Sequence, residues 1–175
     1  MYDTVLRNIG YARSKYQQGA WLDALRSDND VDLELEEKDY ILATIHRAEN
    51  TDDPHKLLTI FRALDQLGLP VLFPIHPRTR KMIHTMQLTS NNIHLVQPVG
   101  YLLMLYLTAH ARMVVTDSGG LQKEAFFLQT PCTTLRDQTE WIETLANQWN
   151  MLCPIDEQSI ITGASRTLPN HQNSQ

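Results

Sequence analysis

The sequence has few cysteines, no long apolar run and no concentration of positive charge. Its two cysteines, Cys132 and Cys153, each lie within an apolar stretch, and no Cys-x-x-Cys or His-x-x-x-His pair occurs. Such closely spaced ligands are typical of structural metal sites, so we expect no metal ion. The two cysteines are expected to be reduced residues of the core.

The apolar segments are too short to span a membrane, and the features of a signal peptide are missing. We therefore expect a cytoplasmic protein that does not contact a membrane. The net charge of -5 and the lack of a basic stripe argue against a partner that is a nucleic acid. A nucleotide is compatible with this composition, because one local anion site is enough to bind it.

The 175 residues suit one domain with its own core. Apolar, β-branched runs alternate with amphipathic stretches, which is typical of βαβ units and a parallel sheet. We expect strands at residues 40–45, 71–75, 93–96, 112–116, 132–135 and 151–153. We expect helices at residues 1–27, 54–67, 77–85, 101–110, 121–128 and 139–146. This predicts an α/β domain at residues 1–165, with a Rossmann-like parallel sheet and helices on both faces, followed by a disordered tail at 166–175.

One expected strand leads directly into an expected helix through Asp117, Ser118, Gly119 and Gly120. Free N–H groups at the start of a helix, together with the helix dipole, form a site for a phosphate group. The glycines let the backbone approach a ligand closely. The alternative is an ordinary turn with Ser118 as the N-cap, and this segment alone does not decide between the two.

Polar residues follow five of the expected strands, at the edge where open parallel sheets bind ligands. These clusters are His46-Arg47, His76, Pro98 to Tyr101, Asp117 to Gly120, and Arg136-Asp137. Together they support a ligand site more strongly than any single motif does.

Five segments occur in the order and spacing of a known family. They are Thr44 to Asn50, Pro74 to Lys81, Gly100 to Leu102, Asp117 to Gly120, and Leu135 to Glu140. Over roughly residues 1–160 the chain resembles the non-hydrolysing UDP-N-acetylglucosamine 2-epimerases. These enzymes have two Rossmann-like domains in the glycosyltransferase-B arrangement, with the active site between them. The resemblance covers the C-terminal, UDP-binding domain, so we expect a fragment, a split-gene product or an excised domain that lacks the N-terminal domain.

The family reaction inverts the carbon that bears the N-acetyl group, by elimination of UDP and its re-addition, and serves surface polysaccharide synthesis. The resemblance implies no cofactor, but it requires a stabilised diphosphate and a proton transfer. Carboxylates of the N-terminal domain would supply much of that transfer. This half is therefore expected to bind UDP and a UDP-N-acetyl sugar without turnover alone. Its partner would be the missing domain, in cis or in trans, and a homodimer is an option that the sequence leaves open.

The resemblance assigns roles to individual residues. His46 would be catalytic, contacting the diphosphate or assisting proton transfer, although a lone histidine after a strand is more often structural. Arg47 would bind phosphate, with a surface ion pair to Glu49 as the alternative. The phosphates would also contact Ser118, Gly119 and Gly120.

Further residues would contact the nucleoside. Glu124 would accept hydrogen bonds from the ribose hydroxyls, with a solvated helix face as the alternative. Val99 would meet the uracil, and Met104 would pack on it, with core packing an equal alternative. Arg136 would pair with phosphate or with a neighbouring carboxylate. His76 and Arg78 resemble a second, regulatory nucleotide-sugar site.

One position departs from the family pattern. Many members have Thr-Glu-Arg-Pro-Glu where this chain has Thr-Glu-Trp-Ile-Glu at residues 139–143. Trp141 is more similar to the branch that includes epimerases of UDP-diacetamido uronic acids, so the sugar stays open. Two other functions also stay open: the donor-binding half of a glycosyltransferase, and a non-catalytic nucleotide-sugar module. The His46-Arg47 motif, together with residues 122–124, favours the epimerase.

Overall fold

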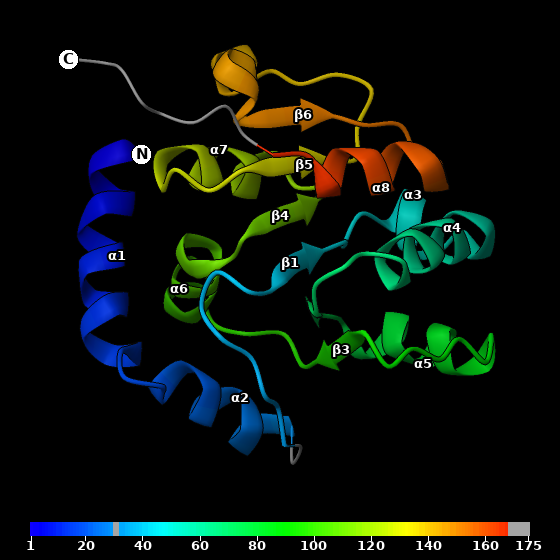
Figure 1. Cartoon of the computed structure of the whole chain (residues 1–175), viewed down its shortest axis with the longest axis horizontal. Coiled ribbons are helices and arrows are strands. Elements are labelled where there is room, and N and C mark those ends of the chain that lie inside the picture. The colour runs from blue at the N-terminus through cyan, green and yellow to red at the C-terminus, as the bar shows by residue number, and fades with distance from the viewer. Residues whose placement is uncertain (30–31, 168–175) are drawn as a thin grey trace.

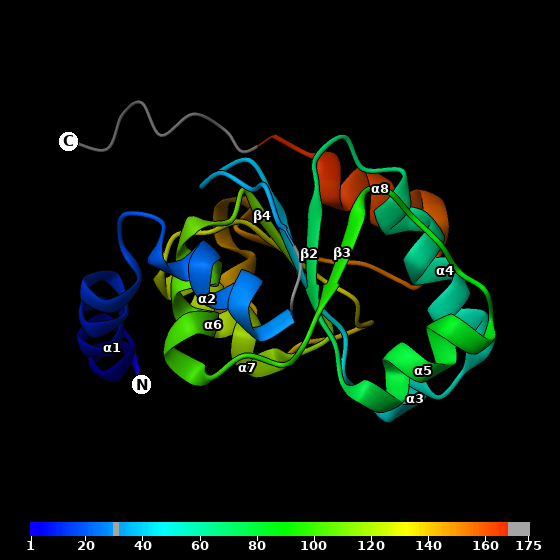
Figure 2. The same ribbon diagram turned by 90° about the horizontal axis from the view of Figure 1, so that it is seen from below.

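The computed structural model describes residues 1–29 and 32–167, which form a six-stranded parallel sheet between two layers of helices (Figure 1, Figure 2). The strand order is β3-β2-β1-β4-β5-β6, and every neighbouring pair is parallel. The chain winds outward from β1 and then from β4, so the sheet has a switch point between these two strands. Doubly wound sheets bind ligands at such a point. The strands are β1 (Ile41–Thr44), β2 (Val71–Pro74), β3 (Ile93–Val96), β4 (Met113–Thr116), β5 (Cys132–Thr134) and β6 (Asn150–Leu152).

Helices cover both faces of the sheet, as Figure 2 shows. One face packs against α1 (Tyr2–Tyr16), α2 (Ala20–Asn29), α6 (Tyr101–His110) and α7 (Gly119–Phe127). The other face packs against α4 (Pro54–Asp65), α5 (Pro77–Thr85) and α8 (Glu157–Ser165). Two short elements, α3 (Ala48–Thr51) and the 3₁₀ helix η1 (Ile142–Gln148), lie in the connections.

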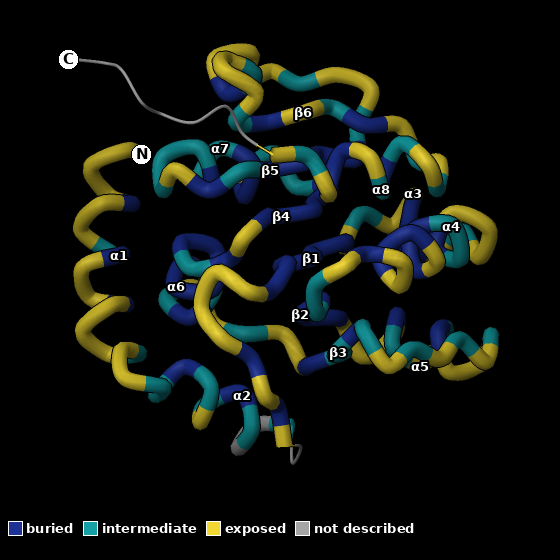
Figure 3. The backbone as a smooth tube through the Cα atoms, in the orientation of Figure 1, coloured by how far each residue is buried: buried dark blue, intermediate teal, exposed yellow. Residues whose placement is uncertain are grey.

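Side chains of the central strands alternate between two apolar clusters. Leu42 and Val114 pack with α1, α2, α6 and α7, whereas Ile41, Ala43 and Val115 pack with α4, α5 and α8. Figure 3 shows β1 and β4 as buried. A strand covered on both faces needs no polar side, which is why these strands appear as continuous apolar runs in the sequence. The predicted α/β class with a parallel, Rossmann-like sheet is confirmed.

Three segments differ from the prediction. Residues 1–27, expected as one helix, form α1 and α2, because Gln18 and Gly19 have positive φ angles of 56° and 83°. The helix expected at residues 139–146 is replaced by η1, which begins at Ile142. Here Thr139 Oγ1 accepts a hydrogen bond from the Trp141 N–H at 3.0 Å, forming a turn that competes with a helix. Two further helices, the short α3 and the whole of α8, were not predicted from the sequence.

Arg166 lies beyond the predicted end of the domain but is part of its packing. Its guanidinium donates hydrogen bonds to Cys132 O at 2.7 Å and to Thr133 Oγ1 and Gly163 O at 2.5 Å each. The ordered domain therefore includes this residue. Of the predicted disordered tail, residues 168–175 lie outside the described residues.

Within residues 1–29 and 32–167, no helix is long and apolar enough to cross a membrane. The same residues contain no group of three His, Cys, Asp or Glu side chains that could hold a metal ion. Cys132 and Cys153 are buried and unpaired, as expected. Burial raises the pKa of the Cys132 thiol to about 12, so this side chain stays protonated.

Gly163 and Gly10 both lie inside helices but in different surroundings, which gives a matched test of packing. A Cβ on Gly163 would lie 2.9 Å from Thr133 Cγ2, whereas a Cβ on Gly10 would meet nothing within 4 Å. We expect Gly163→Ala to lower the free energy of unfolding by about 1–3 kcal/mol through overpacking. We expect Gly10→Ala to raise it by about 0.5–1 kcal/mol through helix propensity. Urea denaturation measures both changes, and an undiminished stability of Gly163→Ala would contradict the packing of α8 on β5.

Candidate functional site

A cavity of about 500 Å³, here called the switch-point cavity, opens at the carboxyl ends of the strands beside the switch point. Its walls come from the segments that follow β1, β2, β3 and β4. A volume of this size is suited to a small molecule such as a nucleotide. The predicted site residues that line it are His46, His76, Val99, Met104, Ser118, Gly120 and Glu124.

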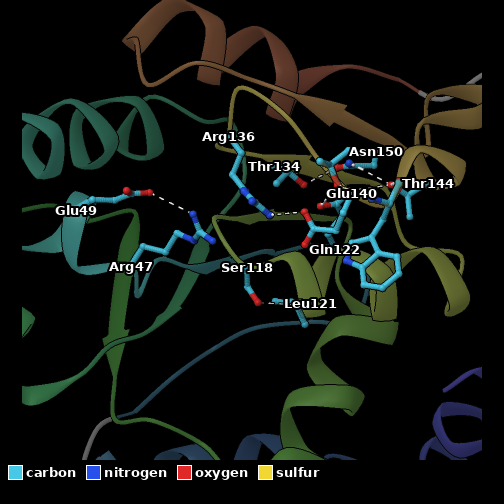
Figure 4. A network of polar contacts seen from close by, with 12 residues as sticks. Arg47, Glu49, Ser118, Leu121, Gln122, Thr134, Arg136, Glu140, Thr144 and Asn150 are labelled. Carbon is cyan, nitrogen blue, oxygen red and sulfur yellow. Dashed lines mark hydrogen bonds and ion pairs between the residues drawn. The ribbon is translucent and has the colours of Figure 1, made fainter.

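A second cavity, of about 440 Å³ and here called the arginine cavity, is lined by Arg47 and Arg136. Arg47 Nη1 lies 3.2 Å from Glu49 Oε1, and Arg136 Nη1 lies 3.4 Å from Glu140 Oε2 (Figure 4). For each arginine, the ion pair with a neighbouring carboxylate that was the alternative to a phosphate contact therefore occurs. Both carboxylates are exposed, and ion pairs of this kind contribute little, so an anionic ligand can replace them.

In the turn Ser118–Gly120, Ser118 and Gly120 line the switch-point cavity, and Gly119 lies beside Arg136 of the arginine cavity. Ser118 caps α7, because its Oγ accepts a hydrogen bond from the Leu121 N–H at 3.2 Å. The N–H groups of Gly119 and Gly120 are in the first turn of α7, where a helix supplies no acceptor. A Cβ on Gly119 would lie 3.1 Å from Arg136 Nη1, so only glycine lets the backbone approach this arginine freely. The cap by Ser118 therefore leaves the N–H groups of Gly119 and Gly120 without an acceptor from the helix, as the predicted phosphate site requires.

Asp117 is fully buried and joins the end of β4 to the segment after β1. Its Oδ1 accepts a hydrogen bond from the His46 N–H at 3.2 Å and lies 3.0 Å from His46 Nδ1. Its Oδ2 accepts hydrogen bonds from the Arg47 N–H at 3.0 Å and from Asn50 Nδ2 at 2.9 Å. A buried carboxylate is tolerated only when its oxygens are satisfied in this way. No individual role for Asp117 was predicted from the sequence, although its place directly after a strand was the available signal.

Glu124 faces the switch-point cavity from α7 and is half-buried, rather than lying on a solvated helix face. Burial raises the pKa of its carboxyl group, and a hydrogen bond from Tyr101 partly opposes that shift. The carboxylate is therefore held in a partly dehydrated place, where it can accept hydrogen bonds from a ligand.

His76 and Arg78 diverge. His76 lines the switch-point cavity and also caps α5, since its Nδ1 accepts a hydrogen bond from the Arg78 N–H at 3.1 Å. Arg78 lines neither of the two cavities in the part of the chain that the structure describes. Its Nη2 pairs instead with Asp52 Oδ1 at 2.8 Å. A regulatory site at these two residues stays a prediction.

Buried Gln122 organises the segment that follows β5. Its Nε2 donates hydrogen bonds to Thr139 Oγ1 at 2.9 Å and to Thr144 Oγ1 at 2.8 Å. On the same helix, Lys123 Nζ lies 3.5 Å from the ring centroid of Trp141. This cation–π contact anchors the residue that departs from the family pattern. These contacts are not predictable from the sequence, because they join two segments that no local sequence pattern connects.

A family model described as UDP-N-acetylglucosamine 2-epimerase matches residues 2–175. The chain belongs to this family. The resemblance seen in the sequence is thus confirmed, over nearly the full length of the chain.

Individual relatives agree with the family match. The chain is 43% identical over 175 residues to the UDP-2,3-diacetamido-2,3-dideoxy-D-glucuronate 2-epimerase of Pseudomonas aeruginosa, which covers 93% of this chain and 49% of the relative. The structure of UDP-GlcNAc 2-epimerase from Methanocaldococcus jannaschii is similar with a TM-score of 0.80 and 32% identity, covering 98% of this chain and 48% of that one. A structure of the same enzyme in complex with UDP-GlcNAc and UDP has a TM-score of 0.73 and 33% identity, covering 93% and 44%. The chain spans about half the length of the relatives it matches.

The raised pKa of Glu124 predicts a dependence of stability on pH. The stability that goes with the neutral carboxyl is complete below the unfolded-state pKa of about 4.3, and is lost as the pH rises through the higher folded-state pKa. We expect Glu124→Gln, which stays neutral and can still accept from Tyr101, to be more stable than wild type at about pH 7. The difference should disappear near pH 4. Urea midpoints at the two pH values measure it.

Glu34→Gln is the matched control for this prediction, because Glu34 is exposed. It should leave the urea midpoint unchanged at both pH values. A Glu124→Gln variant less stable than wild type at neutral pH would contradict the inferred cost of burying this carboxylate.

Proposed function

We propose that this chain is the UDP-binding half of a UDP-N-acetyl sugar 2-epimerase, an isomerase that inverts C2 by elimination and re-addition of UDP. The observation that carries the proposal is the switch-point cavity beside the first turn of α7, in a chain of this family. The related M. jannaschii enzyme, solved with UDP-GlcNAc and UDP, supports the same ligand class. The product would serve as a precursor of surface polysaccharide.

The uridine would occupy the switch-point cavity. Val99 and Met104 line it and offer apolar contacts to the uracil ring. Glu124 would accept hydrogen bonds from the ribose hydroxyls, since a half-buried carboxylate is a strong acceptor for them. The same carboxylate repels phosphate, which orients the nucleotide with its anionic end away from Glu124.

The diphosphate would lie at the turn Ser118–Gly120, with Arg47 and Arg136 at its sides. Free N–H groups at a helix start attract anions. Figure 4 shows the two arginines coming from different loops, near Ser118. The side chain of Arg136 is only 17% exposed, so its charge is screened less than that of a surface arginine. His46, held by Asp117, would complete the site on the sugar side.

We propose that this half binds UDP without turnover by itself. Inversion at C2 needs a proton acceptor and a proton donor, and the family resemblance attributes much of that chemistry to carboxylates of an N-terminal domain. Such a domain, in cis or in trans, is the proposed partner, whereas a cytoplasmic location and a homodimer stay predictions. The epimerase family match favours this function over the glycosyltransferase and the non-catalytic module.

The contact between Glu124 and the ribose predicts a specific loss of affinity. We expect Glu124→Gln to weaken UDP binding about tenfold, the effect of one hydrogen bond to a charged group. The analogues 2′-deoxy-UDP and 3′-deoxy-UDP should bind the wild type more weakly. At least one of them should bind Glu124→Gln as well as it binds wild type. Isothermal titration calorimetry with all three ligands measures this coupling.

The control for the ribose contact is Glu34→Gln, which should bind every ligand like wild type. If the variant at position 124 and both deoxy analogues lose affinity independently of each other, Glu124 does not contact the ribose.

The proposed contact between Arg136 and the diphosphate predicts a loss of affinity that depends on the phosphates of the ligand. We expect Arg136→Gln to weaken UDP binding by roughly 10- to 100-fold, because a charge-assisted hydrogen bond to phosphate contributes about 1.5–3 kcal/mol. Uridine, which lacks phosphate, should bind variant and wild type equally. The exposed Arg62→Gln on α4 is the matched control for loss of one positive charge. An equal loss for UDP and uridine would show that Arg136 supports the fold of the site rather than the diphosphate.

A further inference from the structure

Asp117 and His46 form a pair at the switch point. The geometry of this pair bears on whether His46 contacts the diphosphate or assists proton transfer. The carboxylate of Asp117 is fully buried, whereas the His46 ring is 64% exposed and lines the switch-point cavity. The pair therefore connects the interior of the sheet to the place where the ligand is proposed to bind.

The other contacts of Asp117 decide what it can do to the ring. Its two oxygens face the backbone N–H groups of His46 and Arg47 and the side-chain amide of Asn50, at 2.9–3.2 Å. All of these are donors, and together they hold the carboxylate as an acceptor in a fixed position. A fixed acceptor 3.0 Å from His46 Nδ1 requires that this nitrogen carries a proton.

We propose that Asp117 is a positioning residue that accepts from His46 Nδ1–H, so that the ring, when it is neutral, takes the Nδ1–H tautomer. In that tautomer Nε2 has a lone pair and no proton. A lone pair repels a phosphate oxygen and attracts a hydroxyl. In this tautomer the ring acts as an acceptor toward a hydroxyl group of the bound sugar, not as a donor to the diphosphate. The second half of this inference rests on the proposed function, whereas the tautomer does not.

The tautomer can be measured directly by long-range ¹H–¹⁵N correlation spectra of the ¹⁵N-labelled chain, without nucleotide. The His46 signals are assigned by their loss in His46→Gln, and spectra are recorded at alkaline pH, where the shifts show a neutral ring. We expect a protonated Nδ1 and an unprotonated Nε2 in wild type. A wild-type ring protonated at Nε2 would overturn the proposal, whatever the variants do.

Two variants separate positioning from general support of the loop. Asp117→Ala removes the acceptor, so we expect the ring to move toward the Nε2–H tautomer that free histidine prefers. Asn50→Ala removes one of the donors to Asp117 but leaves the contact with the ring, so it should keep the wild-type tautomer even though it loosens the same loop. An Asp117→Ala spectrum that keeps Nδ1 protonated, or an Asn50→Ala spectrum that changes like that of Asp117→Ala, would overturn the positioning role. If Asp117→Ala does not fold, the wild-type and Asn50→Ala spectra still decide the question.

The samples for these spectra contain no UDP, so the result is independent of whether the chain binds nucleotide. Titration of wild type with 2-acetamido-2-deoxyglucose and, separately, with inorganic diphosphate then tests the acceptor role. A shift of Nε2 with the sugar alone supports it, whereas a shift with diphosphate alone overturns it.

Discussion

The fully buried carboxylate of Asp117 is the constraint on which the rest of the site depends. Asp117 ends β4, and it is satisfied almost entirely by the segment that follows β1. In a medium of low polarity such a charge must have its donors in fixed places. The backbone N–H groups of His46 and Arg47 are therefore tied to the end of β4, although the two side chains reach the surface. The pairing of β1 with β4 thus positions groups that belong to a loop.

The two cavities beside this carboxylate have opposite electrostatic character. Glu124 gives the switch-point cavity an acceptor for hydroxyl groups. In the arginine cavity the cations Arg47, Lys56 and Arg136 outnumber the carboxylates Glu49 and Asp137. A nucleotide has the same division, with a neutral nucleoside and a charged diphosphate. The burial of Glu124 opposes stability, and functional sites commonly retain groups of that kind. The charges of the two cavities would therefore orient a bound nucleotide, with its diphosphate toward the arginines and its nucleoside toward Glu124.

The sequence was sufficient for the sheet and for most of the elements, because continuous apolar runs mark strands that are covered on both faces. It also predicted that the motifs lie at one edge of the sheet, since the carboxyl ends of parallel strands share an edge. It could not show that Asp117 binds the loop of His46, because this contact requires β1 beside β4. Nor could it show that Arg78 turns to Asp52, or that Gln122 holds the segment after β5. These contacts depend on strand order and on side-chain direction, which no local pattern encodes.

The pairing of β1 with β4 also determines when the site comes into being. His46 and Asp117 are 71 residues apart, so a growing chain carries β1, β2 and β3 before the residues that complete the site exist. Contacts between such distant residues form slowly, because a long loop must close first. We therefore expect the turn Ser118–Gly120 and the neighbouring His46 to reach their final places together, late in folding. A ligand that contacts both segments would recognise only the completed sheet and would oppose separation of its two halves.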